Sequence, residues 1–216
     1  MPGVRSSAAE PLTAASLAHA TAELAGRDPI LGEIVARLGV PPLWDREPGF
    51  PTLVHIVLEQ QVSLASARAA FDRLVAAADP LTPGRFLAFA DADLLAFGFS
   101  RQKARYVRLL AAAVGTGALD LAGLAGLDDA EAEQALLAQT GIGPWTAAIY
   151  LLMALRLPDV WPSGDLALVV AVTEAMGRSR RPTRLEMTVL AERWRPWRSV
   201  AARLLWADYL ARRGRM

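Results

Sequence analysis

A short glycine-containing stretch, TGIGPW (140–145), holds the residues that could most directly do chemistry. Glycine tolerates positive φ and close backbone approach, so Gly141, Ile142 and Gly143 can turn their N–H groups outward at the start of a helix. Such a helix start favours a phosphate oxygen, and carbonyls on the other side of the turn could ligate a monovalent cation. The alternative is that Gly-x-Gly-Pro only turns a corner.

The elements around this turn predict two helices rather than one. Residues 135–155 carry no charge, a length that raises the question of a membrane span. The polar and helix-breaking residues at its centre argue against a single spanning helix, because broken backbone hydrogen bonds are costly in lipid. We therefore expect two apolar helices joined by a tight turn, and no membrane partner.

Helical periodicity and capping signals recur along the chain, and no stretch alternates like a strand, so the sequence predicts an all-α protein. Capping-box spacing at Asp128/Glu131 and Thr183/Glu186 marks two helix starts. The expected helices are about 13–25, 29–38, 51–60, 64–78, 83–90, 92–97, 101–115, 129–139, 144–155, 165–176, 184–194 and 197–212. The proline-containing loop at 38–50 is the expected joint between an N-terminal segment and the main body.

Composition narrows the chemistry. The 216 residues, 53% hydrophobic and 21% charged, fit a globular protein of one domain or two small lobes. No cysteine is present, which excludes disulfides, a thiolate nucleophile, Cys-ligated zinc and an iron–sulfur cluster. Two histidines, His19 and His55, are too few for a typical histidine-built metal site. The N-terminus lacks the features of a signal peptide, so we expect a cytoplasmic protein.

The charge distribution is uneven although the net charge is only +1. Residues 178–215 contain eleven arginines and three acidic residues, a formal net charge of +8. This asymmetry is typical of a region that faces a polyanion, most commonly nucleic acid. A solvated, arginine-rich helix surface is the alternative.

Four segments, in this order along the chain, carry a resemblance: LEQQVSLASARAAFDRL (58–74), GFSRQKARYVRLLA (98–111), TGIGPWTAAIYLL (140–152), and DVWPSGDLAL (159–168) continuing to ERWRPWRSVAARLLWADYL (192–210). They resemble the helix-hairpin-helix (HhH-GPD) DNA glycosylases, and among them the alkylpurine branch typified by bacterial 3-methyladenine DNA glycosylase II, in a short form without the N-terminal β domain. The resemblance implies two helical lobes with a DNA-binding cleft. Residues 50–160 would form one lobe, and residues 1–49 and 161–216 would pack together as the other.

The resemblance also implies how DNA would be held. The hairpin residues Gly141, Ile142 and Gly143 would bind a phosphate, and the carbonyls of Leu137, Gln139 and Ile142 would hold a sodium or potassium ion. Gln61 stands where the family places the residue that fills the gap left by a flipped nucleotide, in place of the apolar wedge of well-known members. An ordinary polar residue at a helix end is the alternative reading of Gln61.

The implied chemistry centres on Asp165, at the position of the family's catalytic aspartate. A carboxylate near C1′ stabilises the oxocarbenium-like state formed as an N-glycosidic bond breaks, and can orient water. Trp145 and Trp206 match aromatic positions of the base pocket, and Ile149 and Leu166 replace further aromatics, which implies a more open pocket. The alternatives are an acid in the first turn of a helix for Asp165 and core packing for the tryptophans.

The expected activity is that of a monofunctional enzyme, acting as a monomer on double-stranded DNA with alkylated bases such as 3-methyladenine and 7-methylguanine. In the family, relatives with lyase activity carry a Schiff-base lysine where this chain has Trp145. The only lysine of this chain is Lys103, which the resemblance places in a helix of the scaffold and not in the active site. No cofactor is expected for catalysis. A non-catalytic DNA-binding module and a helical interaction scaffold remain as alternatives.

Overall fold

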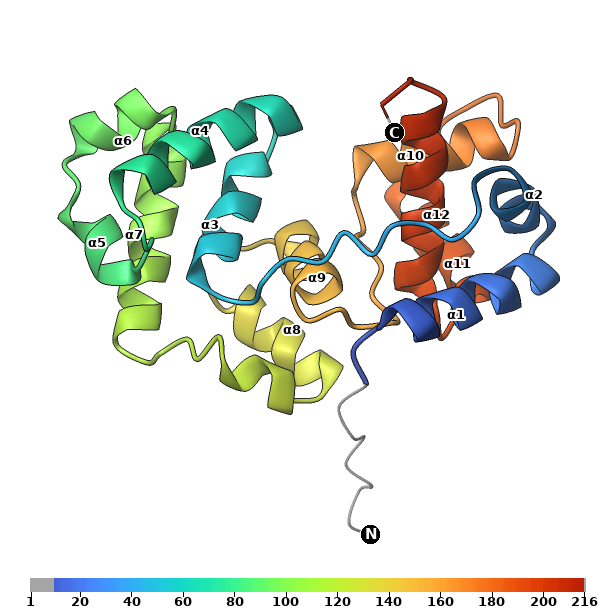
Figure 1. The fold of residues 1–216 in the computed structure, drawn as a ribbon, viewed down its shortest axis with the longest axis horizontal. Helices are drawn as coiled ribbons and strands as arrows, with labels where there is room; N and C mark the ends of the chain where they lie inside the picture. Colours follow the sequence, from blue (N-terminus) through green and yellow to red (C-terminus); the bar gives the residue numbers. More distant parts are fainter. Residues whose placement is uncertain (1–9, 216) are drawn as a thin grey trace, which may run out of the picture. The chain divides into compact units, whose positions relative to one another are not determined.

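The computed structural model describes residues 10–215, and every regular element in this range is helical, which confirms the all-α prediction. The chain divides into two compact units (Figure 1). One contains residues 46–150; the described part of the other contains residues 10–45 and 151–215. The second change of unit falls inside a continuous helix, α9 (Pro144–Met153), ten residues before the boundary that the sequence suggested at 160/161.

Each predicted helix is present, with its ends within three residues of those expected, and both predicted capping boxes are formed. The largest difference is at the end of the helix expected over 184–194. There α11 (Arg184–Ala191) gives way to a 3₁₀ turn, η2 (Glu192–Trp194). The sequence did not indicate a second 3₁₀ turn, η1 (Gly123–Gly126).

The unit of residues 46–150 is built around α3, which is buried over most of its length and packs against α4 and α7. Its helices are α3 (Phe50–Glu59), α4 (Leu64–Ala77), α5 (Pro83–Ala88), α6 (Asp91–Phe97), α7 (Arg101–Gly115), α8 (Asp129–Leu137) and the first turns of α9. The C-terminal end of α3 is fixed by Lys103, whose ammonium donates to the Leu58 carbonyl at 2.7 Å. Burial lowers the pKa of Lys103.

An ion pair secures the start of the same unit. Arg46 donates to both carboxylate oxygens of Glu59, at 3.1 and 2.8 Å, and Glu59 is only 8% exposed. His55 lies one helical turn before Glu59 and stacks on Phe71 with ring centroids 4.4 Å apart. Burial lowers the pKa of His55. These contacts give Glu59 and His55 structural roles.

The other unit is organised around α12 (Arg198–Ala211), whose residues from Ser199 to Asp208 are all buried. It packs against α1 (Ala14–Arg27), α2 (Pro29–Leu38), α10 (Leu166–Ala175) and η2, and α11 joins the unit through η2. Arg203 is fully buried on α12 and donates to three carbonyls, those of Leu43, Leu152 and Ser199. Burial lowers the pKa of Arg203 to about 10, although the nearby Asp45 carboxylate acts in the opposite direction.

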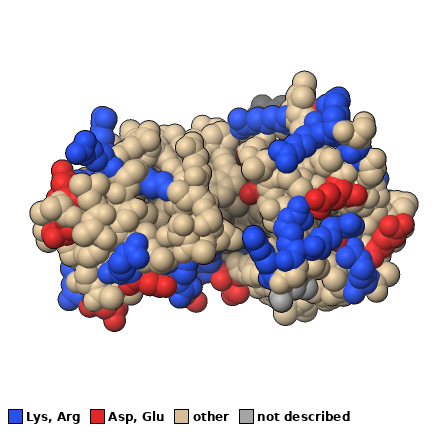
Figure 2. Space-filling view, turned by 90° about the horizontal axis from the view of Figure 1, so that it is seen from above, with Lys and Arg blue, Asp and Glu red and all other residues tan. Residues whose placement is uncertain are grey.

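Most of the arginines between 178 and 215 are used inside this unit. Six of them form ion pairs with acidic side chains: Arg180, Arg193, Arg195, Arg198, Arg212 and Arg213. Three of the acidic partners, Asp28, Asp159 and Glu174, lie outside the arginine-rich stretch. Figure 2 accordingly shows basic side chains interrupted by acidic ones. The local charge of +8 therefore overstates the positive surface offered to a polyanion.

Among the described residues, no helix is both long enough and apolar enough to cross a membrane.

Candidate active site and nucleic-acid interface

Asp165 is the N-cap of α10, so the helix begins one residue later than expected, at Leu166. Its Oδ1 accepts a hydrogen bond from the Leu168 N–H at 2.9 Å and another from the Trp206 indole N–H at 3.2 Å. A side-chain N-cap contributes about 1 kcal/mol to helix stability. Asp165 therefore has the local role that the sequence offered as an alternative, and the same contacts hold its carboxylate in one orientation beside an indole ring.

The surroundings of Asp165 combine a nearly buried aromatic ring with exposed apolar surface. Trp206 reaches it from α12 and is 8% exposed. Leu166 follows Asp165 directly and is 63% exposed, a high value for a leucine. Trp44 lies against Trp206, with ring centroids 6.5 Å apart and the rings inclined at 68°. A carboxylate, two indoles and an exposed leucine thus gather within one unit.

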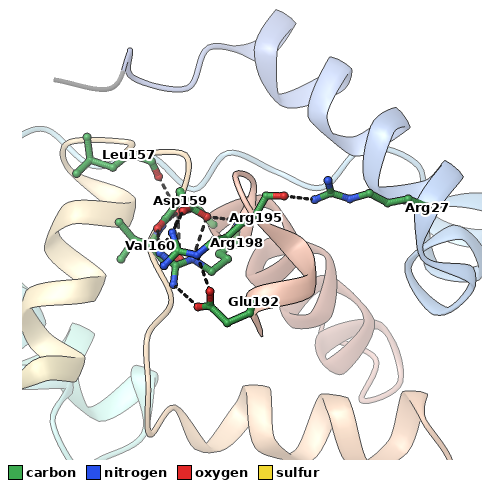
Figure 3. A network of polar contacts seen from close by, with 8 residues as sticks. Arg27, Leu157, Asp159, Val160, Glu192, Arg195 and Arg198 are labelled. Carbon is green, nitrogen blue, oxygen red and sulfur yellow. Dashed lines mark hydrogen bonds and ion pairs between the residues drawn. The ribbon is translucent and has the colours of Figure 1, made fainter. Parts of the chain in front are cut away.

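The chain that leads into Asp165 is tied to the start of α12 by Asp159. Its carboxylate binds the Arg195 guanidinium at 2.5 Å and the Arg198 Nε at 2.9 Å (Figure 3). Arg198 also donates to the Asp159 backbone carbonyl at 2.6 Å. Arg195 in turn is held from α1, because Arg27 donates to its carbonyl at 2.7 Å.

Ser199 adds a second tie to the same segment. Its hydroxyl donates to the Leu157 carbonyl at 2.6 Å and accepts from the Val160 N–H at 3.0 Å. Ser199 is fully buried, where hydrogen bonds are costly to lose. The loop between α9 and α10, which ends at Asp165, is therefore fixed to the start of α12, and a fixed backbone helps to keep one carboxylate in a set orientation.

The hairpin between α8 and α9 lies in the other unit. Gly141 has φ +93°, and a Cβ placed there would come within 2.4 Å of the Tyr106 ring. Its carbonyl accepts from the Gln60 amide at 3.0 Å, and the same amide donates to Thr146 Oγ1 at 2.9 Å. Gly141 is thus required by both the backbone conformation and the close approach of Tyr106.

Gly143 differs from Gly141. It is exposed, its φ is not positive, and a Cβ there would meet nothing within 4 Å. Of the two glycines, which both allow positive φ, only Gly141 adopts it. Nothing in the surrounding fold requires a glycine at 143, so the open space beside its backbone is available to a ligand.

The N–H and carbonyl groups of the hairpin are partly engaged. The Ile142 N–H donates to the Gln139 carbonyl at 3.1 Å, so Ile142 does not turn this group outward as the sequence suggested. Leu137 is the last residue of α8. Backbone carbonyls are suitable ligands for a hard monovalent cation, but the Gln139 oxygen would have to bind the ion while it also accepts the Ile142 N–H.

The remaining site candidates lie in the unit of residues 46–150. Gln61 is exposed and has φ +57°, a left-handed conformation that is uncommon for a residue other than glycine. It follows Gln60, which is tied to the hairpin. Trp145 is half-buried in the first turn of α9, whereas Ile149 is 3% exposed, which leaves little of Ile149 for a base to touch.

Sequence reasoning did not find Trp44, Gln60 or Tyr106. Trp44 lies in the loop that was read only as a joint, and Gln60 was read as the end of a helix. Their contacts join residues 162, 81 and 35 positions apart in the chain, respectively, so no local pattern marks them. The one available signal was a tryptophan in a proline-rich loop.

Comparison with known proteins gives a coherent set of similarities. Residues 54–197 match the model of the HhH-GPD superfamily base excision DNA repair protein. The chain is 36% identical, over 203 residues and 87% of its length, to a probable bifunctional transcriptional activator/DNA repair enzyme AlkA of Mycobacterium tuberculosis. It is 29% identical, over 203 residues and 85% of its length, to a DNA-3-methyladenine glycosylase of Bacillus subtilis. The chain spans 39% of the first relative and 65% of the second.

Among solved structures, the chain is similar to a 3-methyladenine DNA glycosylase (Mag1) of Schizosaccharomyces pombe in complex with abasic DNA. The TM-score is 0.83 at 26% identity, covering 88% of this chain and 98% of that one. A DNA-3-methyladenine glycosidase from Bacillus halodurans aligns with a TM-score of 0.74, also at 26% identity, covering 88% of each chain.

Proposed function

This chain belongs to the HhH-GPD superfamily of base excision DNA repair proteins, and we propose that it is a monofunctional DNA glycosylase of the 3-methyladenine DNA glycosylase II type. Its substrate is double-stranded DNA with alkylated bases, 3-methyladenine and 7-methylguanine among them. The reaction is hydrolysis of the N-glycosidic bond and leaves an abasic site. The single observation that carries the proposal is Asp165, held by the α10 N-terminus and by Trp206.

The chemistry follows from this arrangement. As the bond between sugar and base breaks, positive charge develops on the sugar, and the Asp165 carboxylate stabilises it and orients the attacking water. N3- and N7-alkylated purines are already cationic, so the departing base needs little protonation, and one carboxylate suffices. Trp206 offers an indole ring next to that carboxylate, and indole attracts an electron-poor base.

DNA docks by its backbone in this proposal. The open space at Gly143 lets a phosphate approach the start of α9, where N–H groups and the helix dipole favour an anion. Gly141 keeps the hairpin against Tyr106, and Ile142 closes the turn. A sodium or potassium ion on the carbonyls of Leu137, Gln139 and Ile142 would supply positive charge next to that phosphate.

The remaining assignments come from the family resemblance. Trp145, Leu166 and Ile149 would line the base pocket, with Ile149 contributing least because it is buried. Gln61 would fill the gap left by the flipped base; its exposure and left-handed backbone support this, because functional sites commonly store such strain. Lys103 donates to the Leu58 carbonyl, which supports a reaction without a Schiff base. The protein acts as a monomer.

The test is single-turnover release of 3-methyladenine and 7-methylguanine from methylated duplex DNA. Asp165→Asn removes the charge and keeps a carbonyl oxygen, which can still accept the hydrogen bonds from the Leu168 N–H and the Trp206 indole N–H. The matched control is Asp28→Asn, since Asp28 is also an N-cap in the same unit and also accepts an indole N–H, from Trp194 at 2.7 Å.

We expect Asp165→Asn to lose at least about 100-fold in release rate, the order found when an electrostatic stabiliser is removed from an active site. Asp28→Asn should keep the wild-type rate per folded molecule, and both variants should still bind DNA. Salt-sensitive DNA binding with no base release from any alkylated substrate would favour the non-catalytic DNA-binding module instead.

A further inference from the structure

Trp44 has a backbone conformation that its residue type does not favour. It lies in the loop between α2 and α3 with φ +46°, in the left-handed region where a large side chain is a genuine outlier. Glycine would adopt this conformation without strain. The chain thus has an indole at a position where the backbone conformation alone would favour glycine, so the contacts of the ring must offset this strain.

A buried arginine holds the loop beside Trp44. Arg203 is fully buried in α12, and its Nε donates to the carbonyl of Leu43 at 2.7 Å. The same guanidinium donates to the Leu152 carbonyl at 2.9 Å, so the loop is fixed to the end of α9 as well as to α12. These contacts fix the backbone at Leu43, the residue before Trp44, and the Trp44 indole is half-buried.

The ring of Trp44 reaches the proposed catalytic group through one neighbour. It lies against Trp206 at 6.5 Å between centroids, and the Trp206 N–H donates to Asp165. An edge-to-face pair of indoles leaves two aromatic surfaces at an angle to each other. Trp44, Trp206 and Asp165 all belong to the same unit, so this geometry does not depend on the other unit.

We infer that Trp44 is a further base-contacting residue, which together with Trp206 forms an angled aromatic wall for a flipped, alkylated purine beside Asp165. This inference rests on the proposed function. A planar, positively charged base gains from contact with indole, and a second ring inclined to the first restricts how that base can lie. The wall therefore selects for position and charge of the base without hydrogen bonds to its edge.

The experiment compares Trp44→Gly, Trp44→Phe and Trp197→Ala in single-turnover base release. Trp44→Gly removes the ring and relieves the left-handed strain, so loss of folding does not obscure the result. Trp197 is the matched control: it is half-buried in the same unit and lies 6.5 Å from the His19 ring. Its N–H donates to Glu23 at 2.8 Å, so its removal disturbs the fold at least as much.

Release rates are divided by the fraction of each protein that binds duplex DNA containing an abasic-site analogue. We expect Trp44→Gly to slow the release of 3-methyladenine and 7-methylguanine about tenfold, as for loss of one base–aromatic contact. Trp44→Phe should restore most of the rate, and Trp197→Ala should match wild type. Affinity for the abasic duplex should be unchanged in all three variants.

Equal rates in Trp44→Gly and an active wild type would overturn this inference and leave the proposed function intact. The same loss in Trp197→Ala and Trp44→Gly would also overturn it, because the effect would then be one of general packing. A wild-type protein that releases no alkylated base would overturn both proposals together.

Discussion

Asp28 and Asp165 share one local construction and differ in burial. Each caps the N-terminus of a helix, α2 or α10, and each accepts an indole N–H. Asp28 is 2% exposed, its Trp194 partner is 1% exposed, and Arg193 binds its carboxylate at 3.1 Å. Asp165 is half-buried and precedes an exposed leucine.

The comparison shows that one unit orients a carboxylate in the same way twice, and that the two carboxylates differ in their exposure to solvent. In the Asp28 pair, the same kind of contact joins the start of α2 to the 3₁₀ turn η2, and both side chains are buried. In the Asp165 pair, they hold an acid where a substrate could reach it. A sequence pattern of Asp before a helix cannot distinguish the two cases, because burial depends on the rest of the unit.

The largest difference between the two pairs is expected in stability. Asp28→Ala removes a cap and leaves the buried Trp194 N–H without its acceptor, so we expect a loss of about 3 kcal/mol in the free energy of unfolding. Asp165→Ala should cost about 1 kcal/mol, because the site is open to water. Urea denaturation of both variants measures the difference; equal losses would break the comparison.

The two hairpin glycines extend the comparison to the other unit. Gly141→Ala forces a Cβ against Tyr106 at a positive φ and should cost about 2 kcal/mol or more. Gly143→Ala meets no atom within 4 Å and should fold as stably as wild type, yet bind duplex DNA more weakly. Thermal unfolding and DNA titration at fixed salt check this. Unchanged DNA binding in Gly143→Ala would contradict a phosphate contact there.

The indole partners sharpen the comparison further. Trp194→Phe leaves the buried Asp28 carboxylate short of one donor and should cost about 2 kcal/mol, the sum of lost packing and a lost hydrogen bond to a charged group. Trp206→Phe should cost less stability but slow base release, because the orientation of Asp165 is loosened. If Trp194→Phe slowed release per folded molecule as much, Trp206 would have no specific role.

The smallest expected effect concerns pH and a residue outside both pairs. Burial lowers the pKa of His55, so near pH 6.5 the unfolded chain binds a proton that the folded protein does not. Stability should therefore fall as the pH is lowered through 6.5 and should level off below the folded-state pKa. His55→Gln should remove this part of the fall in urea denaturation. The aspartate variants are best compared above this window.

Much of the fold followed from local patterns. Apolar periodicity and capping residues depend on neighbours within one or two helical turns, so the helices were found with their ends nearly correct. The same reasoning located the hairpin and placed Asp165 at a helix start. The clustering of arginines between 178 and 215 overstated the positive surface, because their acidic partners Asp28, Asp159 and Glu174 lie outside this stretch of the sequence.

By itself, the sequence determined the all-helical class, the helix boundaries to within three residues, the hairpin and the segments that carry the family resemblance, since each depends on residues close together in the chain. Only the tertiary structure decided that Asp28 is buried and Asp165 half-buried, and that Gly141 packs against the Tyr106 ring. It also decided that Trp44 contacts Trp206, the residue that donates to Asp165. Burial and contacts between distant residues come from the packing of whole helices, and no local pattern encodes them.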